Sequence, residues 1–430
     1  MMKPNNMPHK KLIIFDATLF VNAYETKLFR TGLYRVSEQL LKQLQLCSEY
    51  DIWLYDTMGR ERIMRQHIMP NYPNLHLLSS ERTIYVVLTD YVLACADLLR
   101  EKQMQATNKL STGWYKLLKN AFVIYGKVLR KLLPPKKVSI PHADVHYLAT
   151  YYPIPDWVHQ QGIKATLIVH DLIPIAHPEW FPTDANKHTL ESIVYSVTER
   201  DRVVCVSEST RQDLLAYRTD LRPKQVTVAH LAGAEVFKPT PLSDTLRQRL
   251  GINSEYILSV CTLEPRKNLQ LVVRAYEHLL QNNVDTKLPQ LVLVGAIGWK
   301  SGDLIQQIVD LNARYANSII ITGYINDEEL AQLYTGATIF VYPSLYEGFG
   351  LPPLEAMQCG CPVITSEVSS LPEVVGNAGL TIEPTNMLGL VEAINEMLKN
   401  IELYRKASLV RAKEFSWTKM TKQLMKTIKI

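Results

Sequence analysis

The sequence lacks several patterns that identify common classes of protein. Its six cysteines form no CxxC pair and no Cys/His cluster with zinc spacing, so we interpret them as buried thiols of a reducing compartment. No run approaches the roughly 18 apolar residues of a membrane-spanning helix, and the run from Leu12 to Phe15 is too short for a signal-peptide core. No GxGxxG follows that first run, which argues against a dinucleotide-dependent oxidoreductase.

Acidic residues are absent between Glu101 and Asp144, a segment with nine Lys or Arg residues. The whole chain has a formal net charge of +5, which would be −4 without those nine. The basic charge is therefore local. This distribution argues against a general nucleic-acid binder and favours a local anionic partner.

The length of 430 residues favours two domains. Short apolar runs alternate with helical patterns, which predicts α/β domains with parallel sheets. The expected strands are 12–15, 51–55, 145–148, 165–169 and 203–206, then 256–260, 291–294, 319–322, 339–342 and 362–365. A polar loop is expected after the first strand, and a helix after Gly32. The turn signal at 238–241 marks the boundary between a domain of residues 1–245 and one of residues 246–410, with a helix in 411–430.

The segment 343–357 follows an expected strand and carries the densest chemical signal. Its two glycines, Gly348 and Gly350, let backbone N–H groups approach a ligand, and the helix start behind them favours an anion such as a diphosphate. Glu347 and Glu355 bracket the loop, and carboxylates accept hydrogen bonds from sugar or ribose hydroxyls. Taken alone, this spacing also fits a tight turn with two solvated glutamates.

With its neighbours, this segment resembles a known family. From Leu258 to Pro384 the sequence is similar to the retaining GT-B glycosyltransferases of the GT4 family, the group 1 glycosyltransferases, and Glu347 and Glu355 match their E-x7-E motif. The other shared motifs, in order, are Leu263-Glu264-Pro265-Arg266-Lys267-Asn268, Leu293-Val294-Gly295, Gly298-Trp299, Thr322-Gly323-Tyr324, Leu333-Tyr334 and Gly360-Cys361-Pro362-Val363-Ile364. The resemblance implies two Rossmann-like doubly wound domains that face a central cleft. It also implies a C-terminal helix that crosses back to the N-terminal domain.

The resemblance assigns roles to residues of the C-terminal half. Glu347 and Lys267 would be catalytic, and Glu355 would bind the ribose of the donor. The remaining donor contacts would come from cations at Arg266 and Lys267 and from the backbone of Gly348, Phe349, Gly350 and Leu351. Fixed cations stabilise a departing diphosphate more in the transition state than in the ground state. The chain departs from the family where many members have Gly-Arg-Leu, because it has Cys261-Thr262-Leu263 there.

Two residues of the N-terminal half are further candidates. Gly32 matches the family's first glycine loop, near the donor phosphate and the acceptor, although a plain turn explains it too. His170 follows an expected strand and matches the family's His-Asp segment facing the cleft. It would hydrogen-bond the donor sugar or the acceptor as a catalytic residue, and a satisfied core histidine is the alternative. The turn at Ser207 resembles the family's serine-rich turn, and we interpret it mainly as a helix cap.

The resemblance implies a hexosyltransferase of the EC 2.4 class that transfers a mannose- or rhamnose-like sugar, with retention, from a nucleotide diphosphate sugar to a glycan acceptor. A lipid-linked glycan of surface polysaccharide, such as lipopolysaccharide, is the expected acceptor. No Asp-x-Asp triplet occurs, which fits metal-independent transfer without a cofactor. The alternatives are a catalytically inactive nucleotide-sugar-binding protein and a phosphorylase or epimerase of the same fold.

The segment 109–137 is a candidate for contact with an anionic membrane surface. Its apolar residues, from Trp114 to Leu132, recur at spacings of 3 or 4, with lysines and arginines between them. A basic amphipathic helix of this kind lies on anionic membranes, although an ordinary helix packed on the core shows the same pattern. We therefore expect a cytoplasmic protein, peripheral on the inner face of the cytoplasmic membrane.

Overall fold

The computed structural model describes most of the chain. The described residues are 10–26, 32–79, 92, 95, 98, 99, 102, 113–118, 120–122, 124, 125, 138, 140, 144–181, 183–282, 288–316 and 318–429. The chain divides into two compact units, residues 1–167 and residues 168–430.

The first unit is built on parallel strands. The strands are β1 (Lys11–Asp16), β2 (Tyr50–Tyr55), β3 (His76–Leu77), β4 (Val145–Ala149) and most of β5 (Lys164–Val169). The helices are α1 (Thr18–Thr26), α2 (Gly32–Gln45), α3 (Glu61–Ile63), η1 (Met64–Ile68), η2 (Met69–Asn71) and α6 (Asp156–Gln160). Residues 12–15 of β1 are completely buried, because both faces of a parallel sheet are covered. This burial explains the continuous apolar run from which the strand was predicted.

Helix α1 corrects the expectation of a polar loop after the first strand. Its residues Leu19, Phe20 and Val21 are buried, and the Thr18 N–H donates to Asp16 Oδ1 over 3.0 Å where the helix begins. The segment is short and ends in polar residues. Its few apolar side chains therefore show too little helical periodicity for a helix to be predicted from the sequence. Tertiary burial rather than local sequence preference therefore makes it a helix.

The second unit begins at the end of β5 and adds the remaining strands of the first sheet. These are β6 (Arg202–Cys205) and β7 (Val226–Val228), and the whole sheet has the order β3-β2-β1-β4-β5-β6-β7. The boundary between the units falls within β5. The elements around these strands are α7 (Ile173–Ala176), η3 (Pro178–Trp180), α8 (Ala185–Tyr195), α9 (Glu208–Tyr217) and η4 (Pro223–Gln225).

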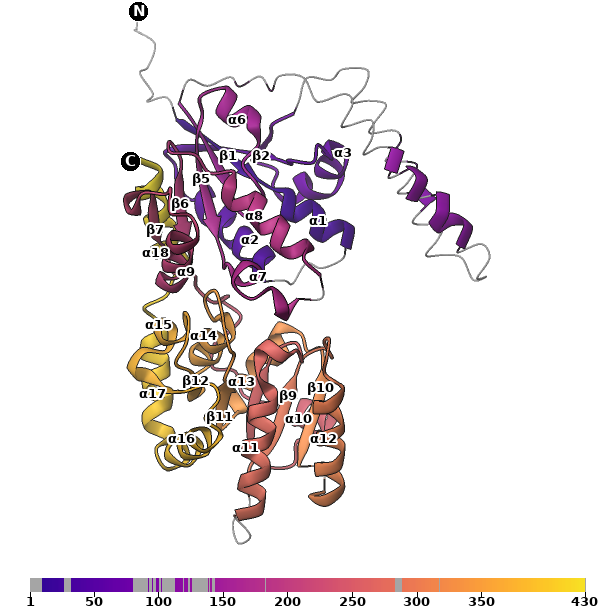
Figure 1. Cartoon of the computed structure of the whole chain (residues 1–430), viewed down its shortest axis with the longest axis vertical. Helices are drawn as coiled ribbons and strands as arrows, with labels where there is room; N and C mark the ends of the chain where they lie inside the picture. Colours follow the sequence, from indigo (N-terminus) through magenta and orange to yellow (C-terminus); the bar gives the residue numbers. More distant parts are fainter. Residues whose placement is uncertain are drawn as a thin grey trace, which may run out of the picture. The chain divides into compact units, whose positions relative to one another are not determined.

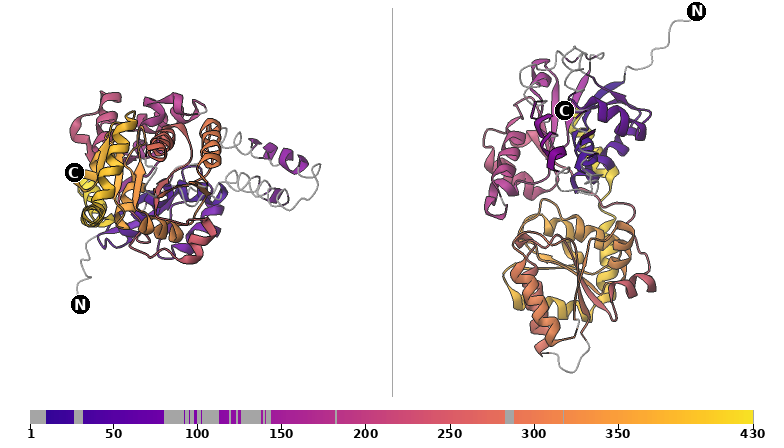
Figure 2. Two further views of the ribbon diagram at one scale, coloured as in Figure 1. Left: turned by 90° about the horizontal axis from the view of Figure 1, so that it is seen from below. Right: turned by 90° about the vertical axis from the view of Figure 1, so that its right-hand side faces the viewer.

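A second parallel sheet, also in the second unit, has the order β10-β9-β8-β11-β12-β13 (Figure 1). Its strands are β8 (Tyr256–Val260), β9 (Gln290–Val294), β10 (Ile319–Gly323), β11 (Ile339–Tyr342), β12 (Val363–Ser366) and β13 (Leu380–Ile382). Helices α11 (Leu269–Asn282), α12 (Gly302–Arg314) and α16 (Met387–Lys399) pack as one layer. Helices α13 (Asp327–Gly336), α14 (Leu351–Gln358), α15 (Leu371–Val375) and α17 (Ile401–Ala412) form another, so both faces are covered (Figure 2).

The chain order of this sheet positions the functional site. The strand order reverses between β8 and β11, so the loops that follow these two strands leave the same edge of the sheet. Ligands of open α/β sheets bind at such a switch point, outside the carboxyl ends of the strands. The remaining elements of this part of the chain are α10 (Asp244–Leu250), η5 (Pro265–Lys267) and η6 (Gly376–Ala378).

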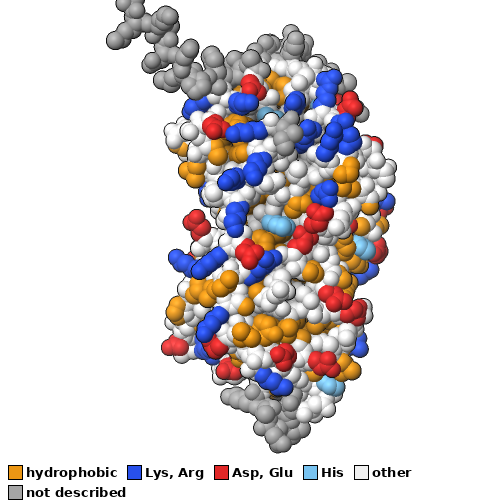
Figure 3. Space-filling model, turned by 90° about the vertical axis from the view of Figure 1, so that its left-hand side faces the viewer, with side chains coloured by type: hydrophobic (Ala, Val, Ile, Leu, Met, Phe, Trp, Pro, Cys, Tyr) orange, Lys and Arg blue, Asp and Glu red, His pale blue; other side chains and the backbone are white. Residues whose placement is uncertain are grey.

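The C-terminal helix α18 (Trp417–Lys429) returns to the first sheet, as expected. It packs against β6, Thr427 Oγ1 lies 3.0 Å from Thr227 Oγ1, and Trp417 Nε1 donates to the Gly233 carbonyl over 3.0 Å. Basic side chains gather in the upper part of the face shown in Figure 3. Among the described residues, no helix is long and apolar enough to cross a membrane.

Candidate functional site

The candidate site is centred on the loop between β11 and α14. Gly350, the residue before α14, has φ 111° and ψ 54°, a left-handed conformation that favours glycine. A Cβ on Gly350 would lie 2.9 Å from Leu371 Cδ2, so the close approach of α15 also requires glycine. The glycine therefore lets the chain turn directly from the loop into a helix at whose start Leu351 can offer its N–H to a ligand, whereas Pro352 and Pro353 have none.

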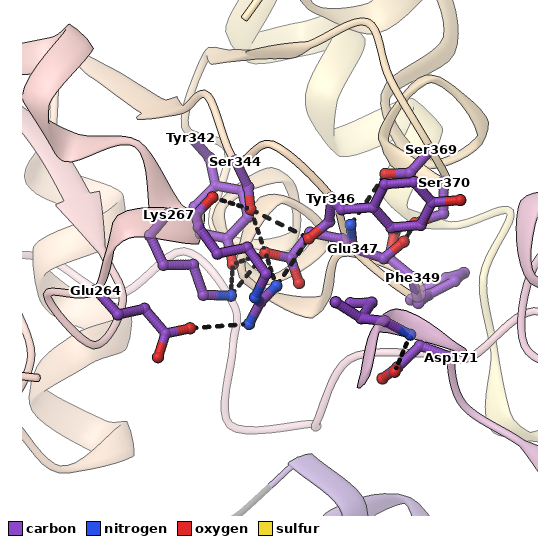
Figure 4. A network of polar contacts seen from close by, with 12 residues as sticks. Asp171, Glu264, Lys267, Tyr342, Ser344, Tyr346, Glu347, Phe349, Ser369 and Ser370 are labelled. Carbon is purple, nitrogen blue, oxygen red and sulfur yellow. Dashed lines mark hydrogen bonds and ion pairs between the residues drawn. The ribbon is translucent and has the colours of Figure 1, made fainter. Parts of the chain in front are cut away.

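Glu347 is the centre of a polar network at this loop (Figure 4). Its Oε1 lies 2.6 Å from Lys267 Nζ and 3.0 Å from Arg266 Nη1. The same oxygen accepts hydrogen bonds from Ser344 Oγ over 2.6 Å and from the Tyr342 hydroxyl over 2.9 Å. Oε2 accepts from none of the described residues and retains access to solvent. One carboxylate oxygen is thus fully engaged, and the other remains for a ligand hydroxyl.

The charges of this network hold Glu347 ionised. Burial alone would raise the pKa of Glu347, but the charges of Lys267 and Arg266 and the bonds from Lys267 and Ser344 lower it to about 2. Burial lowers the pKa of Arg266, but the charge of Glu347 outweighs this and the net shift is upward. Glu347 therefore stays ionised at physiological pH, and Arg266 also pairs with a second carboxylate, since its Nη2 lies 3.0 Å from Glu264 Oε1.

The two cations are fixed by the turn that follows β8. Asn268 ends this turn in the left-handed conformation, with φ 56°, and its Nδ2 donates to the Pro343 and Pro384 carbonyls over 3.0 and 2.8 Å. The Arg266 carbonyl accepts from Leu345 N over 2.8 Å, and Arg266 Nη1 donates to the Tyr346 carbonyl over 2.7 Å. Because the turn and the loop are tied together, the cations keep one position beside Glu347.

Two serines after β12 support the loop, although no motif in the sequence marks them. Ser369 Oγ accepts from Glu347 N over 3.0 Å. Ser370 Oγ donates to the Glu347 and Phe349 carbonyls over 2.9 and 2.8 Å. They lie more than 20 positions beyond Glu347 in the sequence, so only the pairing of β11 with β12 indicates that they are neighbours.

Gly348 is held by the segments that follow β5 and β6. Ser207 Oγ and Thr210 Oγ1 donate to its carbonyl over 2.7 and 3.1 Å. A Cβ on Gly348 would lie only 2.0 Å from the His170 carbonyl oxygen, so this position requires glycine. Ser207 also caps α9, because its side chain accepts from Thr210 N, as the sequence predicted. The structure thus brings the backbone of His170, a predicted site residue, to the loop between β11 and α14.

The neighbouring Asp171 carboxyl also faces this site. Burial raises the pKa of Asp171, and the charge of Glu347 adds to that effect, while the Ile173 N–H and Arg266 oppose it. Asp171 Oδ1 accepts from Ile173 N over 3.0 Å, which begins α7 (Figure 4). The carboxyl therefore orders the turn after β5 and belongs to the same electrostatic environment as Glu347.

The other predicted residues have different surroundings. Glu355 lies on α14, is 5% exposed, and accepts a hydrogen bond from the Tyr334 hydroxyl over 3.4 Å. The Phe349 ring is buried beside His230 and Phe415, at centroid distances of 6.0 and 5.9 Å, so the loop offers its backbone rather than this side chain. Leu351 is the first residue of α14. Gly32 is the exposed first residue of α2 in the first unit, and its role toward a donor stays a prediction.

Two Rossmann-like parallel sheets and a charged glycine loop at the switch point define the class of GT-B glycosyltransferases. Residues 243–409 match the family described as glycosyl transferases group 1. The chain is 34% identical over 272 residues to O-antigen chain mannosyltransferase B of Escherichia coli, a match that covers 62% of this chain and 70% of that protein. The chain therefore belongs to the group 1, or GT4, glycosyltransferases, and it is a hexosyltransferase related to the O-antigen mannosyltransferases.

Solved structures show the same fold. Sucrose-phosphate synthase from Thermosynechococcus elongatus aligns with a TM-score of 0.61 and 18% identity over 98% of each chain. The Anabaena protein HepE, in complex with UDP, aligns with a TM-score of 0.60 and 15% identity over 97% of this chain and 99% of that one. At these identities the likeness establishes the GT-B fold alone.

Proposed function

We propose that this glycosyltransferase moves a mannose- or rhamnose-like hexose from a nucleotide diphosphate sugar to a glycan, with retention of the anomeric configuration. In this proposal residues 246–410 hold the donor, residues 1–245 hold the acceptor, and the helix in 411–430 joins the two parts. The observation that carries it is the Glu347 carboxylate, held ionised by Lys267 and Arg266 beside a glycine loop and a helix start. The proposed transfer uses these two cations in place of a metal ion.

The donor diphosphate is proposed to bind between the cations and the start of α14. Backbone N–H groups of Gly350 and Leu351 and the positive end of the helix dipole attract phosphate oxygens. Lys267 and Arg266 are 12% and 16% exposed, so their charges act in a partly desolvated site where they are stronger than in water. Both stabilise the leaving diphosphate as it gains negative charge.

The transferred sugar is proposed to bind the unengaged Oε2 of Glu347 through its hydroxyls. The acceptor oxygen attacks the anomeric carbon from the face that the diphosphate leaves. The bond from that carbon to the diphosphate oxygen breaks as the new glycosidic bond forms, and the departing phosphate takes the acceptor's proton. Glu347 then acts by binding and electrostatics rather than as a general base, in agreement with its lowered pKa.

The relatives support the choice of sugar and acceptor. The Escherichia coli protein that is 34% identical is an O-antigen chain mannosyltransferase, and the HepE structure contains UDP. We therefore propose a nucleotide-sugar donor for this chain and a surface-polysaccharide glycan, lipid-linked during assembly, as acceptor. GDP-mannose is the first donor to test.

A thermal-shift screen with GDP-, UDP- and dTDP-sugars tests the donor proposal. One nucleotide class should raise the melting temperature, and Glu355→Ala should weaken binding of that nucleotide about tenfold or more, because the proposed contact to the ribose is lost. Glu392→Ala, which removes an exposed glutamate of α16, is the matched control and should bind normally. Absence of binding by all three classes would refute the proposal.

We propose in addition that segment 109–137 contacts an anionic membrane surface, which would hold the enzyme at the inner face of the cytoplasmic membrane. The described residues 113–118, 120–122, 124 and 125 are helical. Several of their large apolar side chains are exposed, with Trp114 62%, Leu117 65% and Ile124 62% exposed. A basic segment with an uncovered apolar face has the composition of a helix that lies at a lipid surface. The rest of the segment lies outside the described residues.

Co-sedimentation with vesicles tests the membrane proposal. The enzyme should bind vesicles rich in phosphatidylglycerol more strongly than vesicles of phosphatidylcholine, and binding should fall at high salt. Leu117→Asp combined with Ile124→Asp should abolish binding, because two charges would enter the apolar face. Leu403→Asp on α17, at a side chain 65% exposed, is the control and should bind like the parent protein. Equal binding to both vesicle types would contradict the proposal.

A further inference from the structure

Three aromatic side chains lie in contact beside the donor loop, and we name them the aromatic platform: His177, Trp180 and Tyr346. The His177 and Trp180 rings stack at a centroid distance of 3.9 Å with 14° between their planes. The Tyr346 ring lies 5.3 Å from His177. His177 and Trp180 come from the segment after β5, whereas Tyr346 precedes Glu347 in the loop after β11. All three are partly exposed, so a ligand can reach them.

Two polar atoms at the border of the platform form no hydrogen bond with any described residue. The Tyr346 hydroxyl donates to Asp213 Oδ2 over 2.7 Å, and Asp213 Oδ1 accepts from none of the described side chains or backbone groups. The Trp180 indole N–H likewise donates to no described residue. A free carboxylate oxygen and a free indole N–H can bind hydroxyl groups, while the aromatic faces can cover the C–H face of a sugar ring.

The charges around the platform distinguish it from the donor site. Asp213 and Glu179 are its acidic neighbours, and Glu179 pairs with His177 over 3.1 Å. Within the described part of the chain, no Lys or Arg pairs with either carboxylate. In Figure 4 the Tyr346 ring points away from Lys267. A diphosphate would be repelled here, whereas a neutral, hydroxyl-rich sugar would be accommodated.

We propose that the aromatic platform and Asp213 form the subsite that binds the acceptor's terminal sugar. This inference rests on the proposed transferase function. Its location follows from the chain itself, because Tyr346 is adjacent to Glu347 and its carbonyl accepts from Arg266 Nη1 over 2.7 Å. A sugar stacked on the platform thus lies beside the residue to which the transferred sugar is assigned. The ring stacking fixes the acceptor, and Asp213 selects the position of one hydroxyl.

Kinetics of platform variants test this subsite with GDP-mannose as donor and methyl α-mannoside and α-mannobiose as acceptors. Trp180→Ala should raise the acceptor KM about tenfold or more, since it removes the stacking surface. Trp180→Phe should restore much of the loss. The dissociation constant for GDP and the slow hydrolysis of donor without acceptor should stay within twofold of the parent enzyme. Tyr195→Ala, an exposed aromatic residue of α8, is the control.

Two further variants test the proposed contact between Asp213 and an acceptor hydroxyl, and melting temperatures test whether each variant folds. Asp213→Asn keeps the size of the side chain and should raise the acceptor KM, while Tyr346→Phe keeps the ring and removes the bond to Asp213. Melting temperatures of all variants identify any that fail to fold. Saturation-transfer NMR with a panel of methyl glycosides should detect acceptor binding in the parent enzyme and its loss in Trp180→Ala.

The outcomes separate this inference from the proposed function. An unchanged acceptor KM in a folded Trp180→Ala variant would overturn the subsite, and so would a weakened GDP affinity, which would assign the platform to the nucleotide base. Failure of every glycoside in the panel to bind the parent enzyme would overturn it too. Binding of a glycoside at the platform by an enzyme that uses no nucleotide sugar would keep the subsite and refute the proposed transfer.

Discussion

Lys267 Nζ lies 2.6 Å from Glu347 Oε1, and each side chain is only 12% exposed. The same carboxylate oxygen also contacts Arg266. Glu347, which is proposed to bind the sugar, therefore forms ion pairs with both cations that are proposed to bind the diphosphate. A change at Glu347 therefore alters both the sugar contact and the charge that the leaving group meets.

Replacing Glu347 with Gln should lower kcat by about 100-fold without weakening nucleotide affinity, because both cations remain in place. The amide keeps the size of the side chain but loses the charge that orders Lys267, and loss of one preorganised electrostatic contact costs about this much. Steady-state kinetics, together with calorimetric titration of GDP, separate the two effects. Normal turnover in this variant would refute the role of Glu347.

Lys267→Ala should lower kcat/KM by about 100- to 1000-fold, because the diphosphate loses a cation as it departs. Lys267→Arg keeps the charge and should be less impaired. The double variant Lys267→Ala with Glu355→Ala should abolish transfer, since it removes a proposed contact to the phosphate and one to the ribose. Measurable transfer at the parental rate in the double variant would mean that the donor binds elsewhere.

Gly348→Ala should disrupt the contact between the donor loop and the turn after β5. The new Cβ would lie 2.0 Å from the His170 carbonyl oxygen, a backbone atom that cannot move away alone. We expect a loss of about 1–3 kcal/mol in the free energy of unfolding and a large loss of transfer. Gly302→Ala, where a Cβ meets no atom within 4 Å, is the control for chemical unfolding and should be close to neutral.

Asp16→Asn should change how stability depends on pH. Burial is the main cause that raises the pKa of Asp16 from 3.8 to about 7, and its Oδ2 has no partner among the described residues. A carboxyl with a raised folded-state pKa destabilises the protein progressively as pH rises from 3.8 to about 7, because only the folded state holds the proton there. The variant lacks this penalty, which is of the order of a few kcal/mol.

Melting temperatures of the Asp16→Asn variant and the parent protein at pH 5 and pH 8 check this prediction. The difference in favour of the variant should be larger at pH 8, where the parental carboxylate is ionised. The charged neighbours Asp56 and Arg60, which pair over 2.8 Å, are present in both proteins and cancel in the comparison. A difference that is the same at both pH values would show that Asp16 is not neutral when folded.

Much of the loop proposed to bind the donor could be identified in the sequence because its signals are local. Glu347, Gly348 and Gly350 lie in one loop, and a strand followed by a glycine turn and a helix is a pattern visible in the sequence itself. The Lys267 turn was predicted from the resemblance to the GT4 family. These elements follow from short-range rules of backbone conformation and from the burial of parallel strands.

The supporting residues were not predictable, because their neighbours are distant in the chain. Ser369 and Ser370 carry no motif of their own and reach the Glu347 loop only after β12 has paired with β11. The second role of Ser207, as a donor to Gly348, depends on how the turn after β6 meets a loop 141 positions away. No local pattern records contacts of this range.

The sequence by itself determined the alternation of strands and helices, the glycine loop with its two glutamates and the basic pair at 266 and 267, since each depends on residues close together in the chain. Tertiary structure alone decided that Thr18–Thr26 is a helix, that one oxygen of Glu347 receives four donors, and that the ring of His177 lies beside that of Tyr346. The physical reason is that burial and side-chain contacts depend on which segments the folded sheets bring together. Sequence spacing alone does not specify those partners.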